Sequence, residues 1–172
     1  MNPIETLRHS YLPAVCKVVL IGESAPDGGN FFYKGDTLCT YTKEAFCIAF
    51  PDANIPNDNM MFLDYFRDHG FYLDDLSLIP INNAGPQIRQ QLNREGISSL
   101  SKRLRDYNPK VVICIMLGIR DYVKDAVERS RLPATIEFRA IPFGGNGQQG
   151  RYREELAVIL RDLQQRNVIN IN

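Results

Sequence analysis

The sequence predicts an α/β protein, a three-layer α/β/α sandwich with a central four-stranded, largely parallel sheet. Strand-like apolar segments alternate with helix-like segments along the chain. Two of them, 17–22 and 110–117, are apolar almost throughout, which is typical of parallel strands covered on both faces. With 172 residues, of which 44% are hydrophobic and 23% charged, the chain has the length and composition of one globular domain over residues 1–172.

Glycine or proline bounds each predicted strand, and these residues commonly mark the places where a chain turns. The segment 71–79 lies between Gly70 and Pro80, and the segment 110–117 follows Pro109. The predicted strands cover residues 17–22, 71–79, 110–117 and 134–141.

Helical patterns fill the segments between and after the strands. The last and longest pattern, 151–166, places Leu156 and Leu160 on one face, which is typical of a helix that packs on a core. Gly96 separates two shorter patterns, so we expect a break in the helix there. The predicted helices cover residues 42–50, 59–69, 86–94, 98–107, 119–129 and 151–166.

The formal net charge of zero hides an uneven distribution of charge. Residues 1–85 carry 5 Lys+Arg against 11 Asp+Glu, whereas residues 86–172 carry 15 against 9. One interpretation is a chance distribution over a mixed surface. The other is a basic face, formed by the second half, that suits an acidic partner such as nucleic acid.

Cysteine and histidine usage gives no sign of a metal site or a disulfide framework. The 4 cysteines form no C-x-x-C pair, and the 2 histidines lack ligand spacing. We therefore expect no metal, no iron–sulfur cluster and no other cofactor. No apolar run approaches the length of a membrane span, and no secretory signal is visible. These features predict a monomeric protein of the cytoplasm, without a membrane partner.

The loop after the first predicted strand combines a carboxylate, glycines and aromatic side chains. Glu23 follows the strand directly, Gly28 and Gly29 come next, and the aromatic run 31–33 follows. The loop lacks the glycine patterns of dinucleotide and nucleotide-triphosphate sites. The aromatic residues are suited to stack on a planar base, and Glu23 to position a water. The alternative is a tight turn with a capping acid and a hydrophobic plug.

The loop after the last predicted strand, 142–153, leads into a helix and is rich in glycine. Helix N-termini bind phosphate through free N–H groups, and glycines make that backbone accessible. Arg151 and Arg153 add positive charge to the first turn of this helix. Positive charge is unfavourable at the positive end of the helix dipole, and a bound anion would offset that cost. The alternative is a flexible connection with solvated arginines.

Together these loops resemble the motifs of the uracil-DNA glycosylase superfamily. The residues Gly22-Glu23-Ser24-Ala25-Pro26, followed by Phe31-Phe32-Tyr33, are similar to the family's Gly-Glu-Ala-Pro-Gly motif and its base-stacking Phe. The segment 142–147 with Arg151 takes the place of the family's second motif, and Asp74-Asp75 that of its base-reading residue. The chain is most similar to a divergent branch with a Gly-Glu-Ser-x-Pro motif, as a single uracil-DNA glycosylase-like domain over residues 1–172.

The resemblance implies a hydrolase of base excision repair that binds DNA and cleaves the N-glycosidic bond of a flipped damaged or modified base. In this interpretation Glu23 positions the attacking water, and Asn146 is assigned as the second catalytic residue. Asn146, Gln148 or Gln149 would act as a neutral donor in place of the family's histidine. The base-binding residues are Phe32, Tyr33, Asp74 and Asp75. The DNA phosphates contact Gly144, Gly145, Gly147, Gln148 and Arg151.

The sequence also departs from the family's motifs. Pro26 stands one position later than the family's proline, the second motif lacks its histidine, and the base-reading residue is Asp rather than Asn. An ionised Asp only accepts hydrogen bonds, so it suits an exocyclic amino group better than the O4 of uracil. In another interpretation Asp74 and Asp75 cap or turn the chain and read nothing.

Two further function classes remain open at this level. A protein with this fold that lacks the histidine could be a non-catalytic nucleic-acid or nucleotide-binding module. A generic flavodoxin-like α/β protein could instead bind a small phosphate ligand, and would then show no salt-dependent affinity for DNA.

Overall fold

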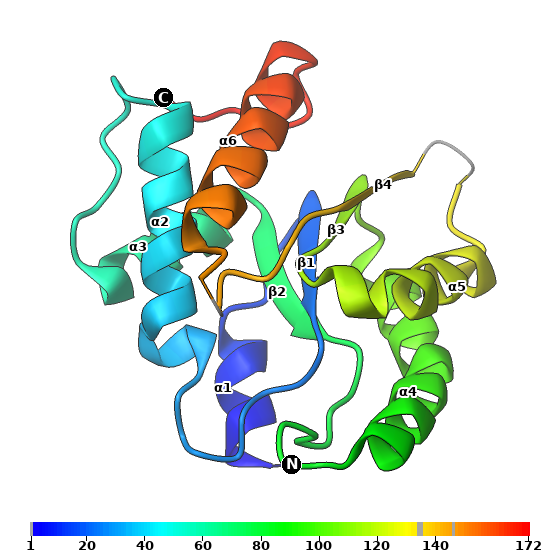
Figure 1. Cartoon of the computed structure of the whole chain (residues 1–172). Coiled ribbons are helices and arrows are strands. Elements are labelled where there is room, and N and C mark those ends of the chain that lie inside the picture. The colour runs from blue at the N-terminus through cyan, green and yellow to red at the C-terminus, as the bar shows by residue number, and fades with distance from the viewer. Residues whose placement is uncertain (1, 134–135, 146) are drawn as a thin grey trace.

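The structure, a computed structural model, describes residues 2–133, 136–145 and 147–172. Within them the chain forms an α/β fold with a four-stranded, all-parallel sheet in the order β2-β1-β3-β4 (Figure 1). This confirms the predicted fold class. The strands are β1 (Val18–Gly22), β2 (Phe71–Asp75), β3 (Val111–Cys114) and β4 (Glu137–Ala140).

Helices cover both faces of the sheet. Helices α2, α3 and α6 gather on one side, and α4 and α5 pack together on the other (Figure 1). Helix α1 lies beside the edge strand β2, to which its Arg8 is hydrogen-bonded. The helices are α1 (Pro3–Ser10), η1 (Phe32–Lys34), α2 (Thr37–Ala49), α3 (Asn59–Asp68), α4 (Pro86–Tyr107), η2 (Leu117–Ile119), α5 (Arg120–Ser130) and α6 (Gln149–Gln165).

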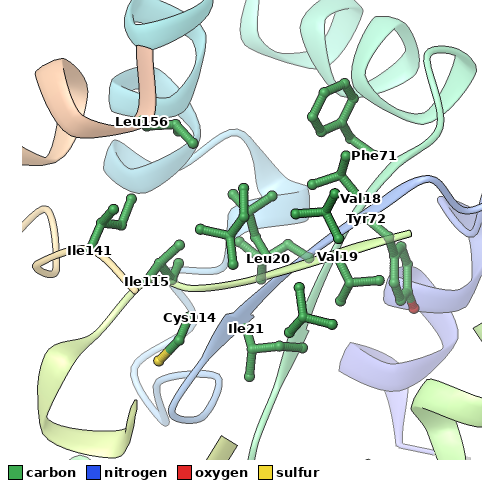
Figure 2. Packing of buried hydrophobic residues seen from close by; sticks show 14 of the residues in the cluster. Val18, Val19, Leu20, Ile21, Phe71, Tyr72, Cys114, Ile115, Ile141 and Leu156 are labelled. Atoms are coloured by element: carbon green, nitrogen blue, oxygen red, sulfur yellow. The ribbon is translucent and has the colours of Figure 1, made fainter. Parts of the chain in front are cut away.

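The core explains why the central strands are apolar on both faces. Each residue from Val18 to Ile21 in β1 is at most 1% exposed, because helices cover both faces of the sheet (Figure 2). The apolar tail also joins the core, since Ile169 and Ile171 are buried. Gln164 holds Ile171 by hydrogen bonds to its N–H and carbonyl, so the tail packs without adding a strand to the sheet. Within the described ranges, no helix is both long and apolar enough to cross a membrane.

Several predicted boundaries were wrong. Strand β2 ends at Asp75 rather than at residue 79, because the chain turns away where Ser77 bonds to Ile79. Helix α2 begins at Thr37, where the Asp36 side chain caps the Cys39 N–H, and not at residue 42. The first two residues of the predicted strand 134–141 lie outside the described residues. Helix α1 was not predicted, although Asn2 caps it and a proline opens it.

The predicted break at Gly96 was also wrong, because α4 runs without interruption through this residue. A Cβ atom at Gly96 would lie 2.5 Å from the carbonyl oxygen of Leu76. The glycine therefore serves close packing between α4 and the chain that leaves β2, and not a turn.

Replacing Gly96 with alanine is expected to lower the free energy of unfolding by about 1–3 kcal/mol, because backbone must move to admit the methyl group. Urea unfolding measures the effect. The matched control is Gly150→Ala in α6, where a Cβ meets nothing within 4 Å, so that the variant should be neutral or stabilised by up to about 1 kcal/mol. Equal stability of Gly96→Ala and the wild type would contradict the close packing.

Candidate functional site

A cavity of about 260 Å³ lies at the carboxyl ends of β1, β2 and β3. In open parallel sheets, ligands bind at this edge, next to the point where the strand order reverses, here between β1 and β3. Its walls come from several loops, so residues distant in sequence meet there. The cavity is lined by Gly22, Glu23, Ser24, Ala25, Pro26, Phe31, Phe32, Asp36, Leu38, Leu73, Asp75, Asn82, Arg89, Ile115, Met116 and Phe143.

Glu23 enters the cavity from the end of β1 and is held by α4. Arg89 Nε donates to Glu23 Oε1 at 2.7 Å, and Arg89 Nη2 donates to the other carboxylate oxygen. Asn93 Nδ2 also donates to Oε1, at 3.1 Å. Because Arg89 and Asn93 are four residues apart, they share one face of the helix. These bonds fix the carboxylate in a single orientation at the cavity wall.

Asp75 lines the same cavity from the end of β2, and its carboxylate is hydrogen-bonded to Arg8 of helix α1. Arg8 Nη2 donates to Asp75 Oδ2 at 2.7 Å, and Arg8 Nη1 donates to Asp74 Oδ1 at 3.0 Å. Gly22 pairs with Asp75 across the two strands, and a Cβ at Gly22 would lie 2.5 Å from Asp75 Oδ1. Any larger residue at position 22 would clash with the Asp75 carboxyl, so the glycine allows this carboxyl to lie over the end of β1.

The neighbouring carboxyl, Asp74, is not among the residues that line the cavity, because successive side chains of a strand point to opposite faces. Its side chain is fully buried and accepts hydrogen bonds from Arg8, Arg103 and Tyr107. Arg103 also donates to the Asp75 carbonyl. Of the two predicted base-reading carboxylates, the structure thus places only Asp75 in the cavity.

The two carboxyl groups differ in their tendency to ionise. Burial opposes the ionisation of Asp74, but Arg103 and Arg8 outweigh it and hold its pKa below the usual value. Burial raises the pKa of Asp75, and Arg8 offsets this only in part. Asp74 is therefore the structural anion of this cluster, and Asp75 the group that protonates first.

The predicted aromatic run divides between the cavity wall and the core. All three rings are buried, each at most 2% exposed, but Phe31 and Phe32 line the cavity and Tyr33 does not. Tyr33 is 1% exposed and stacks on Tyr11 with ring centroids 5.0 Å apart. Its hydroxyl donates to the Leu73 carbonyl at 2.9 Å and accepts from the Leu73 N–H at 2.7 Å. Tyr33 thus braces β2, and Phe32 is the predicted stacking residue that reaches the cavity.

The glycine-rich loop reaches the cavity through Phe143 alone among its described residues. Gly144 packs against Tyr152 and Tyr41, where a Cβ would have neighbours at 3.3 Å. The positive φ of Gly147, 79°, favours glycine. Gln148 directly precedes α6, and neither it nor Gly145 lines the cavity. The predicted catalytic residue Asn146 lies outside the described residues.

Arg151 lies in the first turn of α6 and not in the cavity wall. Its side chain is 61% exposed and donates from Nε to Glu155 Oε1 at 2.7 Å, one turn along the helix. Arg153 instead pairs with Glu44. Arg151 is thus the more exposed of the two arginines, and its guanidinium is open to an anion.

Sequence reasoning missed the residues that orient the two cavity carboxylates, namely Arg8, Arg89 and Asn93. It also missed Arg103, which binds the Asp74 carboxylate and the Asp75 carbonyl. A helix signal for α1, an asparagine followed by a proline at Asn2 and Pro3, was present and would have placed Arg8 on an element. Which carboxylate each arginine meets is set by tertiary packing. Among the described residues, no three His, Cys, Asp or Glu side chains are grouped so that they could hold a metal ion.

A comparison with protein-family models and a comparison with curated proteins each found no match to this chain. The class of this protein is accordingly described by its fold and its cavity. It is a parallel α/β protein with a small, largely apolar site at the carboxyl edge of its sheet. Two carboxylates held by hydrogen bonds, Glu23 and Asp75, line this site.

Proposed function

We propose that this cavity receives a nucleobase flipped out of DNA and that the protein hydrolyses the N-glycosidic bond of that base. The observation that carries the proposal is that Glu23 and Phe32, from the loop after β1, and Asp75, from the end of β2, line one cavity. Its volume of about 260 Å³ lies near the lower end of small-molecule sites, which suits a small planar ligand. The motif resemblance to uracil-DNA glycosylases supports the same assignment.

Each lining group has a role in this chemistry. The phenyl rings of Phe31 and Phe32 offer apolar walls to the faces of the base, and Asp75 offers a polar atom to its edge. Cleavage of a glycosidic bond passes through an oxocarbenium-like state, which a nearby carboxylate stabilises. Glu23 supplies that charge and takes a proton from the attacking water, whose oxygen bonds to C1′ as the C1′–N bond breaks. The electron pair of that bond leaves with the base, which then takes up the proton.

We assign the contacts with the DNA phosphates on either side of the base to the loop that precedes α6. Gly144, Gly145 and Gly147 would offer backbone N–H groups, and Arg151 its exposed guanidinium. Gln148 would offer its side-chain amide, because its backbone N–H already donates to the Gly145 carbonyl at 3.1 Å. Phe143 belongs to this loop and also lines the cavity, so a DNA strand bound at the loop would lie beside the cavity.

Arg151→Ala is expected to weaken DNA binding about equally for all sequences and to reduce the salt dependence of the affinity by about one unit of slope. Fluorescence anisotropy over a series of salt concentrations measures this slope. The control is Arg129→Ala in α5, because Arg129 is also exposed and also pairs with a carboxylate one turn away. An unchanged slope in Arg151→Ala would remove this residue from the DNA interface.

The experiment that tests the proposal is a base-release assay. Oligonucleotides that each carry one candidate base are incubated with the protein and treated with alkali, which cuts the strand at abasic sites. Alkali-dependent cleavage at the candidate base supports a glycosylase. Binding to these strands with no cleavage of any of them would contradict it.

A second candidate is a binding module that recognises a base without cleaving it. The bridge between Arg89 and both oxygens of Glu23 favours it, since a carboxylate so engaged is a weaker acceptor for water. A salt titration of DNA binding, run beside the release assay, distinguishes the two. Salt-dependent affinity without base release indicates the binding module.

A further inference from the structure

Asp75 presents one oxygen to the cavity in a fixed orientation. Its Oδ2 accepts from Arg8 at 2.7 Å, and the whole residue is 4% exposed. Its other oxygen, Oδ1, lies over Gly22. Within the part of the chain that the structure describes, Oδ1 has no protein hydrogen-bond partner. A hydrogen-bond acceptor at a cavity wall is therefore left for a ligand.

The carboxyl cannot turn this oxygen away without losing its anchor. Arg8 is 1% exposed and binds Glu5, Asp74 and Asp75 together, and its guanidinium also lies 5.3 Å from the ring of Phe31. The Asp75 N–H donates to Asp74 Oδ1 at 2.7 Å, which fixes the backbone. The acceptor is thus preorganised before any ligand arrives.

The other charged groups of the cavity also favour a ligand that donates hydrogen bonds. The lining carries the carboxyl groups Glu23, Asp36 and Asp75. Among the described lining residues the cation is Arg89, and it is engaged with Glu23. A carbonyl or an anion placed at Asp75 would face a hydrogen-bond acceptor instead of a donor, which disfavours its binding there.

We propose that Asp75 determines specificity by selecting bases that present an exocyclic amino group, as cytosine and adenine do, over their keto counterparts, uracil and hypoxanthine. This rests on the proposed function, since it takes the flipped base as the ligand of the cavity. An ionised carboxylate accepts a hydrogen bond from an amino group and repels a carbonyl oxygen. This one contact therefore distinguishes the amino base from the keto base in each pair.

The test uses two matched pairs of single-stranded oligonucleotides, one with cytosine or uracil and the other with adenine or hypoxanthine at one position. Single strands remove base pairing from the comparison. Burial raises the pKa of Asp75, so the assays are run at about pH 8.5, well above the ordinary pKa of a carboxyl group, to keep this carboxyl ionised. Both base release and equilibrium affinity are measured for wild type, Asp75→Asn and Asp106→Asn.

The wild type is expected to favour the amino member of at least one pair by about tenfold or more. Asp75→Asn, whose amide both donates and accepts, should lose or invert this preference, and Asp106→Asn, at an exposed site on α4 outside the cavity, should keep it. A wild-type preference for the keto member, or an Asp75→Asn preference equal to that of the wild type, would overturn the inference.

The two proposals fail in different ways. If the wild type releases no base from any strand, the glycosylase proposal fails, and the ratio of the affinities within each pair still decides the role of Asp75. If bases are released with no dependence on Asp75, the specificity inference fails and the glycosylase proposal stands. The wild-type ratio alone decides if Asp75→Asn does not fold, which its urea unfolding curve shows.

Discussion

Glu23→Gln is expected to lower the rate of base release by about 10²- to 10⁴-fold, the range that a positioned acid or base contributes. The amide keeps the shape of the side chain but cannot supply the negative charge that the oxocarbenium-like state needs. Single-turnover assays at saturating protein measure the effect. Arg89 is half-buried and open to water, so the variant should fold, and circular dichroism checks this.

The matched control is Asp125→Asn, which removes a carboxylate that also accepts from Nε and Nη2 of an arginine, here Arg129, but lies away from the cavity in α5. We expect wild-type rates for it. If Glu23→Gln kept the full rate of base release, Glu23 would not be the residue that acts on the glycosidic bond.

The largest expected effect on stability comes from Asp74→Asn, which should lower the free energy of unfolding by about 3–5 kcal/mol. The side chain of Asp74 is fully buried and accepts from Arg8 at 3.0 Å, Arg103 at 2.7 Å and Tyr107 at 3.0 Å. Removal of the charge leaves two guanidinium groups with one fewer buried counterion. Urea unfolding at neutral pH measures the loss.

The loss should also depend on pH with a defined sign. Because the folded pKa of Asp74 is lowered, its contribution to stability is present above the unfolded value of about 3.9. It disappears as the pH falls through the folded pKa, so the difference between wild type and variant should shrink in acid. The control Asp106→Asn, at an exposed site on α4, should leave stability unchanged. Equal stability of Asp74→Asn and wild type would contradict a structural ion cluster.

The fold could be predicted from the sequence because its central strands have a distinctive composition. Strands buried on both faces must be apolar throughout, so β1 and β3 stand out in the sequence. The ends of β2 could not be predicted in the same way. Apolar residues continue past Asp75 in the turn around Ser77, and a local pattern does not show where a strand leaves the sheet.

The candidate site could be predicted only in part. Glu23 and Asp75 follow or close predicted strands, so the topology alone brings them to one edge. Their anchors could not be found in this way, because Arg89 is 66 residues from Glu23 and Arg8 is 67 residues from Asp75. Tyr33 was predicted to stack on a base because sequence does not distinguish an aromatic ring in a wall from one in the core.

The most direct test of the account is to count free base and abasic sites together. Wild-type protein is incubated with the strand it cleaves best, free base is measured by mass spectrometry, and abasic sites by alkaline cleavage. Hydrolysis of the N-glycosidic bond predicts equal amounts of the two products from the wild type, and formation of both by Glu23→Gln at a rate lower by about 10²- to 10⁴-fold. Strand breaks without free base, or free base from Glu23→Gln at the wild-type rate, would contradict the account.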